Sequence, residues 1–195
     1  MHEDIGVTLR RGFWMRWRVR AGYLVAVAYW LLARPTPRSV WMGAIVAGLG
    51  LAIRAAAAGH LRKDRELAIS GPYARTRNPL YLGSFFLAAG FVVAGSSWWS
   101  GVLVAAYFAL FYYGVMRNEE QHLRERFGES FDAYAARVPL FFPRMGSRGA
   151  AARPPGSGFS WAQYRRNREY QALIGTILAL GAVALRMWLR VRGGL

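Results

Sequence analysis

Apolar residues in this chain come in long blocks and do not alternate with polar ones. The blocks cover residues 17–34, 39–58, 80–96, 98–116 and 170–189. A helix needs about 20 residues to cross about 30 Å of hydrocarbon. The pattern therefore predicts an all-α, polytopic membrane helix bundle with about five transmembrane helices. The first block is the weakest because three arginines crowd its start, and an interfacial helix or a tilted span is the alternative there.

The segments between the blocks predict how the helices connect. Two prolines in residues 34–38 predict a tight turn, and the adjacent Trp98 and Trp99 are typical of the membrane–water interface. Gly43, Ala47 and Gly50 predict a face of close helix packing. The chain is predicted to be a single domain, residues 1–195, with an additional C-terminal helix at about 160–190.

The fourth apolar block continues into a polar, helical pattern. Leu123 and Phe127 keep a helical spacing beyond Met116, which predicts that this helix runs out of the membrane and breaks at Gly128. A short amphipathic helix is expected over 131–138, and residues 144–158 have the composition of a flexible loop.

Charge is distributed unevenly between the two sides of the predicted bundle. The net charge is +16, and 20 of the 26 Lys and Arg residues fall on the side of the N-terminus, against five on the other. This asymmetry predicts a cytoplasmic N-terminus. Because topology explains the charge, we expect no nucleic-acid partner. The Arg-, Ala- and Gly-rich composition suggests a bacterial protein, and hence its inner membrane. With no cysteine and three scattered histidines, no metal site is expected.

Two polar clusters stand out where apolar blocks meet water on the predicted cytoplasmic side. Asn78 is suited to cap a helix that starts at Pro79. The free N–H groups of that helix, flanked by Arg75 and Arg77, suit a carboxylate or phosphate, although an ordinary capped membrane helix has the same pattern.

The second cluster is Glu119-Glu120, which follows the fourth apolar block. Helical spacing places Glu119 on the face of Leu123 and Phe127, so its side chain is predicted to face a protein pocket. Glu120 shares a face with Arg124 and is predicted to be solvated, in a surface pair.

In order along the chain, these clusters form a longer pattern. It comprises Gly71-Pro72-Tyr73, Arg77-Asn78-Pro79-Leu80-Tyr81-Leu82-Gly83, Glu119-Glu120, Leu123, Phe127-Gly128, Tyr134, Val138-Pro139 and Pro143. The pattern, within about residues 65–143, resembles the isoprenylcysteine carboxyl methyltransferase family. These are small membrane enzymes related to the phospholipid methyltransferases.

The resemblance implies S-adenosylmethionine as the cofactor, with S-adenosylhomocysteine as its product, in a pocket on the cytosolic side. The residues implied to bind it are Arg65, Glu66, Leu67, Ala68, Tyr73, Arg77, Asn78, Pro79, Leu80, Tyr81, Glu119 and Glu120. The family usually has His at the position of Asn78 and often Tyr at that of Phe131. It also implies a lipid or lipidated substrate that enters from the bilayer.

Methyl transfer to a carboxylate needs an aligning cation rather than a base, because the carboxylate is already ionised at neutral pH. Where eukaryotic members carry a substrate-binding Arg this chain has Val115, so nearby Arg117 is the first candidate for this catalytic role. Arg54 is the second, and it could instead snorkel toward a helix end.

The predicted function is transfer of a methyl group to a lipid-linked acceptor, first of all the carboxylate of a prenylcysteine-like substrate. The alternative on the same scaffold is a phospholipid or small-molecule N-methyltransferase, whose aromatic lining would stabilise a cation. A non-enzymatic membrane scaffold or transporter subunit is the alternative of another class.

Overall fold

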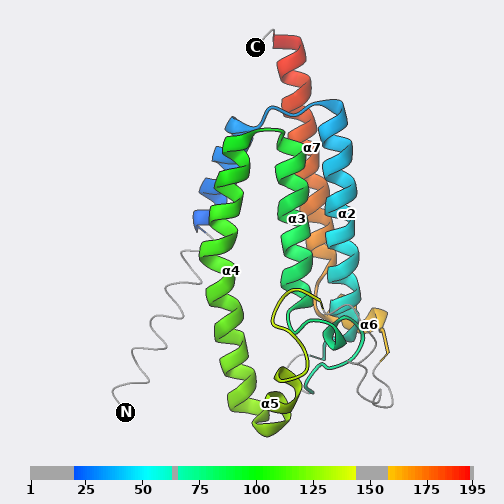
Figure 1. Ribbon diagram of the computed structural model, residues 1–195. Coiled ribbons are helices and arrows are strands. Elements are labelled where there is room, and N and C mark those ends of the chain that lie inside the picture. The colour runs from blue at the N-terminus through cyan, green and yellow to red at the C-terminus, as the bar shows by residue number, and fades with distance from the viewer. Residues whose placement is uncertain (1–19, 63–65, 144–157, 194–195) are drawn as a thin grey trace.

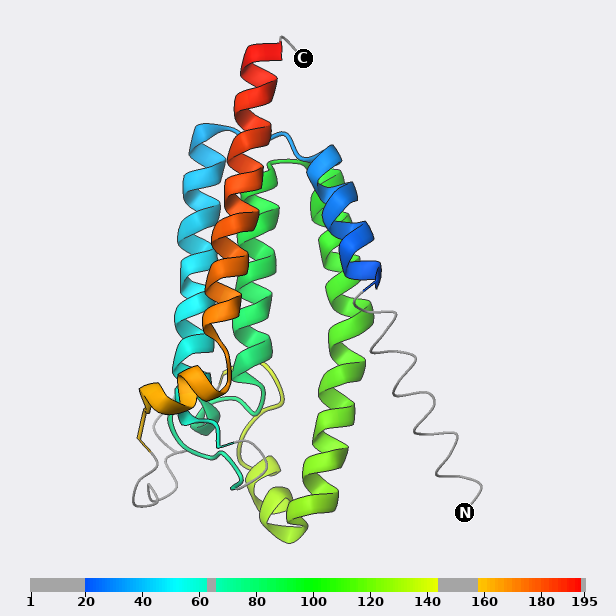
Figure 2. The same cartoon turned by 180° about the vertical axis from the view of Figure 1, so that it is seen from behind.

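The computed structural model describes residues 20–62, 66–143 and 158–193, and all regular structure in these ranges is helical. The helices stand side by side in an elongated bundle (Figure 1). Helices α2 (Pro37–His60), α3 (Pro79–Gly95) and α7 (Tyr170–Gly193) form one side, and α4 (Trp98–Phe127) forms the other together with the N-terminal helix Arg20–Leu32 (Figure 2). The predicted all-α membrane bundle is confirmed.

Three of the five predicted spans are long and apolar enough to cross a membrane by length and composition: α2, α4 and the stretch Tyr170–Arg192 of α7. The other two, Arg20–Leu32 and Pro79–Gly95, are shorter apolar helices. With 17 residues, α3 is about 25 Å long. The start of the first predicted span, residues 17–19, and almost all of the predicted loop 144–158 lie outside the described residues.

Helices α2 and α3 make the closest packing in the bundle, and glycines on both helices allow it. A Cβ atom on Gly43 would lie 2.5 Å from the carbonyl oxygen of Gly90, and one on Gly50 would lie 2.6 Å from that of Gly83. The backbones therefore touch where the sequence predicts a face of small residues. This is the arrangement by which membrane helices associate without a hydrophobic driving force between them.

Replacing Gly43 by alanine is expected to lower the free energy of unfolding by about 1–3 kcal/mol, because the new methyl group must push two backbones apart. The matched control is Gly48→Ala on the same helix, where an added Cβ meets no atom within 4 Å. Unfolding of both variants in mixed micelles measures the difference. Equal stabilities would show that α2 and α3 are not held at this distance.

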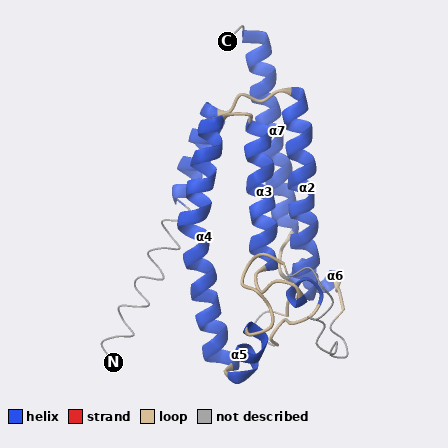
Figure 3. Ribbon diagram, viewed as in Figure 1, coloured by secondary structure: helices blue, strands red, loops and turns tan. Residues whose placement is uncertain are grey.

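Most of the loop segments, drawn in tan, gather at one end of the bundle, and the short helices lie there too (Figure 3). This site end contains the 3-10 helix η1 (Gly71–Ala74), α5 (Glu129–Ala135) and α6 (Trp161–Arg166), beside the start of α3 and the end of α4. The far end is formed by residues 33–36, the connection Ser96–Ser97 and the last turns of α7. The chain direction thus brings residues 71–83 and 119–120 to the same end.

The helix boundaries at the site end follow local sequence signals. Helix α3 begins at Pro79, and α4 runs to Phe127 and ends at Gly128, whose φ is +50°. Both boundaries confirm the sequence prediction. The short helix after the break, α5, starts two residues earlier than predicted. Its Phe131 and Tyr134 are buried in a small core with Val138, Leu67 and Ile69, which ties α5 to the segment before η1.

Candidate functional site

A cavity of about 440 Å³ opens at the site end, between the segment before α3 and the end of α4. It is lined by the predicted residues Arg54, Glu66, Leu67, Ala68, Tyr73, Arg77, Asn78, Pro79, Leu80, Tyr81, Glu119 and Glu120. Segments that are some 40 residues apart in the sequence therefore contribute to one cavity. Of the predicted residues, Arg65 lies outside the described part of the chain and Arg117 does not line the cavity.

Tyr81 and Glu119 join the two walls of this cavity. The Tyr81 hydroxyl donates a hydrogen bond of 2.8 Å to Oε2 of Glu119, from the first turns of α3 to the last part of α4. In the described part of the chain, no ion pair engages the Glu119 carboxylate. Its remaining acceptor positions are thus available to hydroxyl or ammonium groups.

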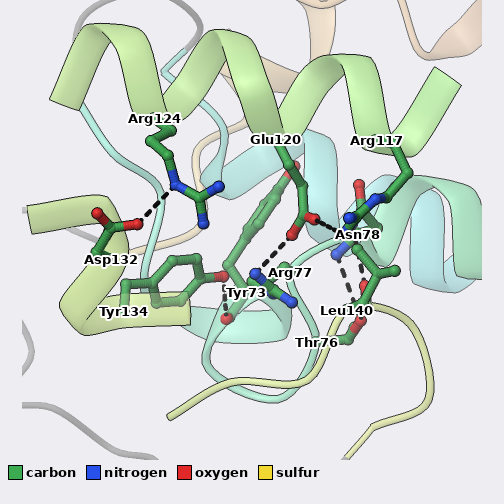
Figure 4. Close-up of polar contacts among 10 residues, drawn as sticks. All are labelled: Tyr73, Thr76, Arg77, Asn78, Arg117, Glu120, Arg124, Asp132, Tyr134 and Leu140. Carbon is green, nitrogen blue, oxygen red and sulfur yellow. Dashed lines mark hydrogen bonds and ion pairs between the residues drawn. The ribbon is translucent and has the colours of Figure 1, made fainter. Parts of the chain in front are cut away.

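Glu120 is buried, and the prediction that it is solvated is wrong. Only 7% of the residue is exposed, and its carboxylate pairs with Arg77 at 2.6 Å and with Arg117 at 3.3 Å (Figure 4). Arg124, the predicted partner, instead pairs with Asp132 at 2.7 Å. The periodicity of α4 alone could not reveal this, because the segment before α3 covers the face that carries Glu120.

Arg117, the first candidate for aligning a substrate, does not line the cavity. Its side chain is 60% exposed, and its contact is with Glu120 on the same helix. The geometry does not bring this first candidate to the cavity.

Arg54 does line the cavity, but it does not snorkel toward water. Its Nε forms an ion pair with Oε1 of Glu169, just before α7, and its Nη1 donates to Oγ of Ser84 at 2.5 Å. Its side chain is 21% exposed. The guanidinium is therefore held between α2, α3 and the start of α7, with its charge already matched by a carboxylate.

Asn78 occupies the N-cap position of α3, but its side chain does not cap the helix. Its Nδ2 donates instead to the carbonyl oxygen of Leu140 at 3.0 Å (Figure 4). The neighbouring Thr76 hydroxyl donates to the carbonyl oxygen of Phe141 at 2.8 Å. The backbone N–H of Arg77 donates to Pro139 at 2.9 Å. The segment after α5 is thus fastened to the start of α3, and the Asn78 amide serves this contact.

Two tyrosines form the floor of the cavity. Tyr134 donates its hydroxyl hydrogen to the carbonyl oxygen of Tyr73 at 2.7 Å. Tyr73 is 7% exposed, and its own hydroxyl has no hydrogen-bond partner among the described residues. Burial, and secondarily the nearby Glu119 carboxylate, raise the pKa of Tyr73, and burial raises that of Tyr134. Both phenols stay protonated at neutral pH, so Tyr73 offers a neutral donor to the cavity.

Further lining residues come from α4, α5 and the end of α2. They are Leu61, His122, Leu123, Arg126, Phe127, Phe131 and Tyr134. His122 and Arg126 were not predicted as site residues, although they follow Glu119 by three and seven positions on one helix. That spacing is the signal that could have found them. Leu61 follows α2 directly and carried no such signal.

This arrangement defines a membrane helix bundle with a polar cavity at one end. Residues 49–130 match the model of the phospholipid methyltransferase family. This matched stretch includes most of the residues that line the cavity. The match confirms the predicted resemblance to the membrane methyltransferases.

Two curated proteins are similar in sequence to part of this chain. The nickel-cobalt-cadmium resistance protein NccN of Alcaligenes xylosoxydans xylosoxydans is 36% identical over 134 residues, 62% of this chain and 62% of the relative. The cobalt-zinc-cadmium resistance protein CzcN of Cupriavidus metallidurans is 33% identical over 138 residues, 66% of this chain and 62% of the relative. The chain thus spans less than two thirds of these relatives. No solved structure matches it.

Proposed function

We propose that this protein is a membrane methyltransferase that uses S-adenosylmethionine and acts on a lipid-linked acceptor. The observation that carries the proposal is the contact of Tyr81 with Glu119, which joins two separate motif segments at one cavity within the family-matched region. The cavity opens at the site end, which the arginine distribution predicts to be the cytoplasmic face of the membrane.

The chemistry of the lining residues fits such a cofactor. The Glu119 carboxylate, which has no cationic partner in the described part of the chain, suits ribose hydroxyls or an ammonium group. The Tyr73 hydroxyl supplies a neutral donor from the floor. Leu67, Leu123 and Phe127 give an apolar wall for an adenine ring. The cavity thus combines polar and apolar groups as small-molecule sites do.

Glu119 and Tyr73 would hold the cofactor in the cavity, and when bound it would supply a methyl group activated on a sulfonium. The residues of this chain orient the two reactants and exclude water, which alone can lower a barrier by several kcal/mol. An acceptor that is already ionised needs no base from the protein. A protonated amine must lose a proton before transfer.

The acceptor has two candidates. The carboxylate of a prenylcysteine-like substrate, predicted from the sequence, would need a free arginine in the cavity. The second candidate is an amine. Of the two arginines predicted to align a carboxylate, Arg54 already has its charge matched by Glu169, and Arg117 lies outside the cavity, which supports the amine. An amine and its methylated, cationic product would find the Glu119 carboxylate and the aromatic rings of Tyr73 and Tyr81 at this site.

Transfer of a labelled methyl group tests both the activity and the acceptor. We expect the purified protein to label phosphatidylethanolamine or a farnesylcysteine-type substrate in mixed micelles. Label that survives mild base indicates an amine, and label released by base indicates an ester. Failure to label either lipid, together with no heat on titration of S-adenosylhomocysteine, would contradict the proposal and support a scaffold or transporter subunit.

A further inference from the structure

We propose a second binding site, for the phosphate of an anionic phospholipid, at the far end of the bundle. A cavity of about 430 Å³, the far-end cavity, lies there between the turn after the N-terminal helix, the connection from α3 to α4, and the last turns of α7. Arg34, Arg186 and Arg190 line it together with Trp98 and Trp99. It lies at the opposite end of the bundle from the candidate site and does not depend on the proposed activity.

The far end carries positive charge without acidic residues to balance it. The acidic residues in the described part of the chain are Glu66, Glu119, Glu120, Glu125, Glu129, Asp132 and Glu169, and all of them belong to the site end. Arginines at the border of a membrane are costly unless an anion or water matches them. The described part of the chain provides no anion at the far end, so an anion that matches this charge would have to come from outside it.

Arg186 is fixed in place by the protein. Its guanidinium donates to the carbonyl oxygens of Leu31 and, at 3.0 Å, Ala33, and it lies 4.6 Å from the ring centre of Trp30. These carbonyls are at the end of the N-terminal helix, where the helix dipole favours a cation. The far-end cavity therefore has one rigid, positively charged wall.

Arg34 and Arg190 complete the cavity from two other segments. Neither side chain makes a hydrogen bond, an ion pair or a ring contact with the described residues, so both guanidinium groups can bind a ligand. The planar donor fork of arginine matches the oxygens of a phosphate. The first residues of α4 also line this cavity, and Ser97, the N-cap of that helix, makes no side-chain hydrogen bond to its N–H groups.

The exposed tryptophans indicate where the ligand comes from. Trp98 and Trp99 are 80% and 68% exposed, and such tryptophans mark the level of the lipid headgroups. A phosphate bound between Arg34 and Arg190 would lie at that level, with its acyl chains along the apolar outer surface. A lipid headgroup and a soluble ion could both supply a phosphate to this cavity. The position of the cavity at the headgroup level favours the lipid.

The test compares two double variants of the full-length protein in an uncharged detergent. Arg34→Gln with Arg190→Gln removes the two unengaged guanidinium groups of the cavity. Arg38→Gln with Arg192→Gln removes the same charge from arginines at the same end that do not line it. The probes are phosphatidylglycerol, phosphatidylcholine and inorganic phosphate, and binding is measured by native mass spectrometry and by the rise in the thermal-unfolding midpoint.

We expect phosphatidylglycerol to bind about thirtyfold more weakly to the first double variant than to the wild type, and the control variant to keep its affinity. Equal losses in both variants would overturn the proposal in favour of general surface charge. If phosphatidylcholine binds the wild type as tightly as phosphatidylglycerol does, the site does not require an anionic lipid. If inorganic phosphate raises the thermal-unfolding midpoint as much as phosphatidylglycerol does, the ligand is not a lipid. Either result would overturn the proposal. If the first variant fails to fold, Arg34→Lys with Arg190→Lys retains the charge, and its affinity must lie between the other two.

Discussion

Replacing Glu120 by alanine is expected to lower the free energy of unfolding by about 3–5 kcal/mol, the largest effect of any single substitution considered for this chain. The cause is the guanidinium of Arg77, which is 16% exposed and pairs with Glu120 at 2.6 Å. Without that carboxylate a buried cation has no counter-charge, and the ion pair that joins the segment before α3 to α4 is lost. Unfolding in mixed micelles measures the loss.

The matched control for this prediction is Glu125→Ala on the same helix. Glu125 is exposed and accepts a hydrogen bond from Gln121 at 3.0 Å, so its loss should change stability by no more than about 0.5 kcal/mol. The double variant Arg77→Gln with Glu120→Gln removes both charges and should be more stable than Glu120→Ala alone. If Glu120→Ala and Glu125→Ala unfold alike, Glu120 does not hold a buried pair.

Replacing Glu119 by alanine is expected to weaken the binding of S-adenosylhomocysteine about 100-fold while the protein stays folded. The carboxylate lines the cavity and is exposed, so its removal costs little stability, but a ligand would lose up to two charge-assisted hydrogen bonds. Calorimetric titration of both proteins measures the difference.

Tyr81→Phe is the control for the Glu119 variant, because it removes the hydrogen bond of 2.8 Å and keeps the carboxylate. We expect it to weaken binding by less than about tenfold. An equally large loss in Tyr81→Phe would show that the alanine variant acts by misplacing α4. Unchanged binding in Glu119→Ala would contradict a contact between this carboxylate and the cofactor.

Features that depend on neighbouring residues could be predicted from the sequence. The start of α3 at Pro79 and the end of α4 at Gly128 follow from Pro and Gly, whose backbone preferences act locally. The proximity of Tyr81 and Glu119 could be predicted from the order of the helices. Two successive apolar helices, α3 and α4, return the chain to the end of the bundle where α3 begins. Element order and local signals therefore predicted where the candidate cavity lies.

Features that depend on contacts between distant segments could not be predicted. The burial of Glu120 requires Arg77, which approaches from a different element, and the amide of Asn78 is taken by Leu140, 62 residues away. The ion pair of Arg54 spans 115 residues. Neither periodicity nor spacing encodes such pairs, so the sequence analysis assigned the wrong partner to Glu120 and did not identify the ion pair of Arg54.

The ion pair between Arg54 and Glu169 has a consequence for how this chain could be shortened. Arg54 lies inside the family-matched stretch 49–130, and Glu169 lies well beyond it. A fragment cut at residue 130 would keep the guanidinium between two helices and discard its counter-ion, together with the carbonyl oxygen that holds Asn78. We therefore expect the fragment 49–130 not to fold on its own, because the residue just before the C-terminal helix supplies the partner of Arg54.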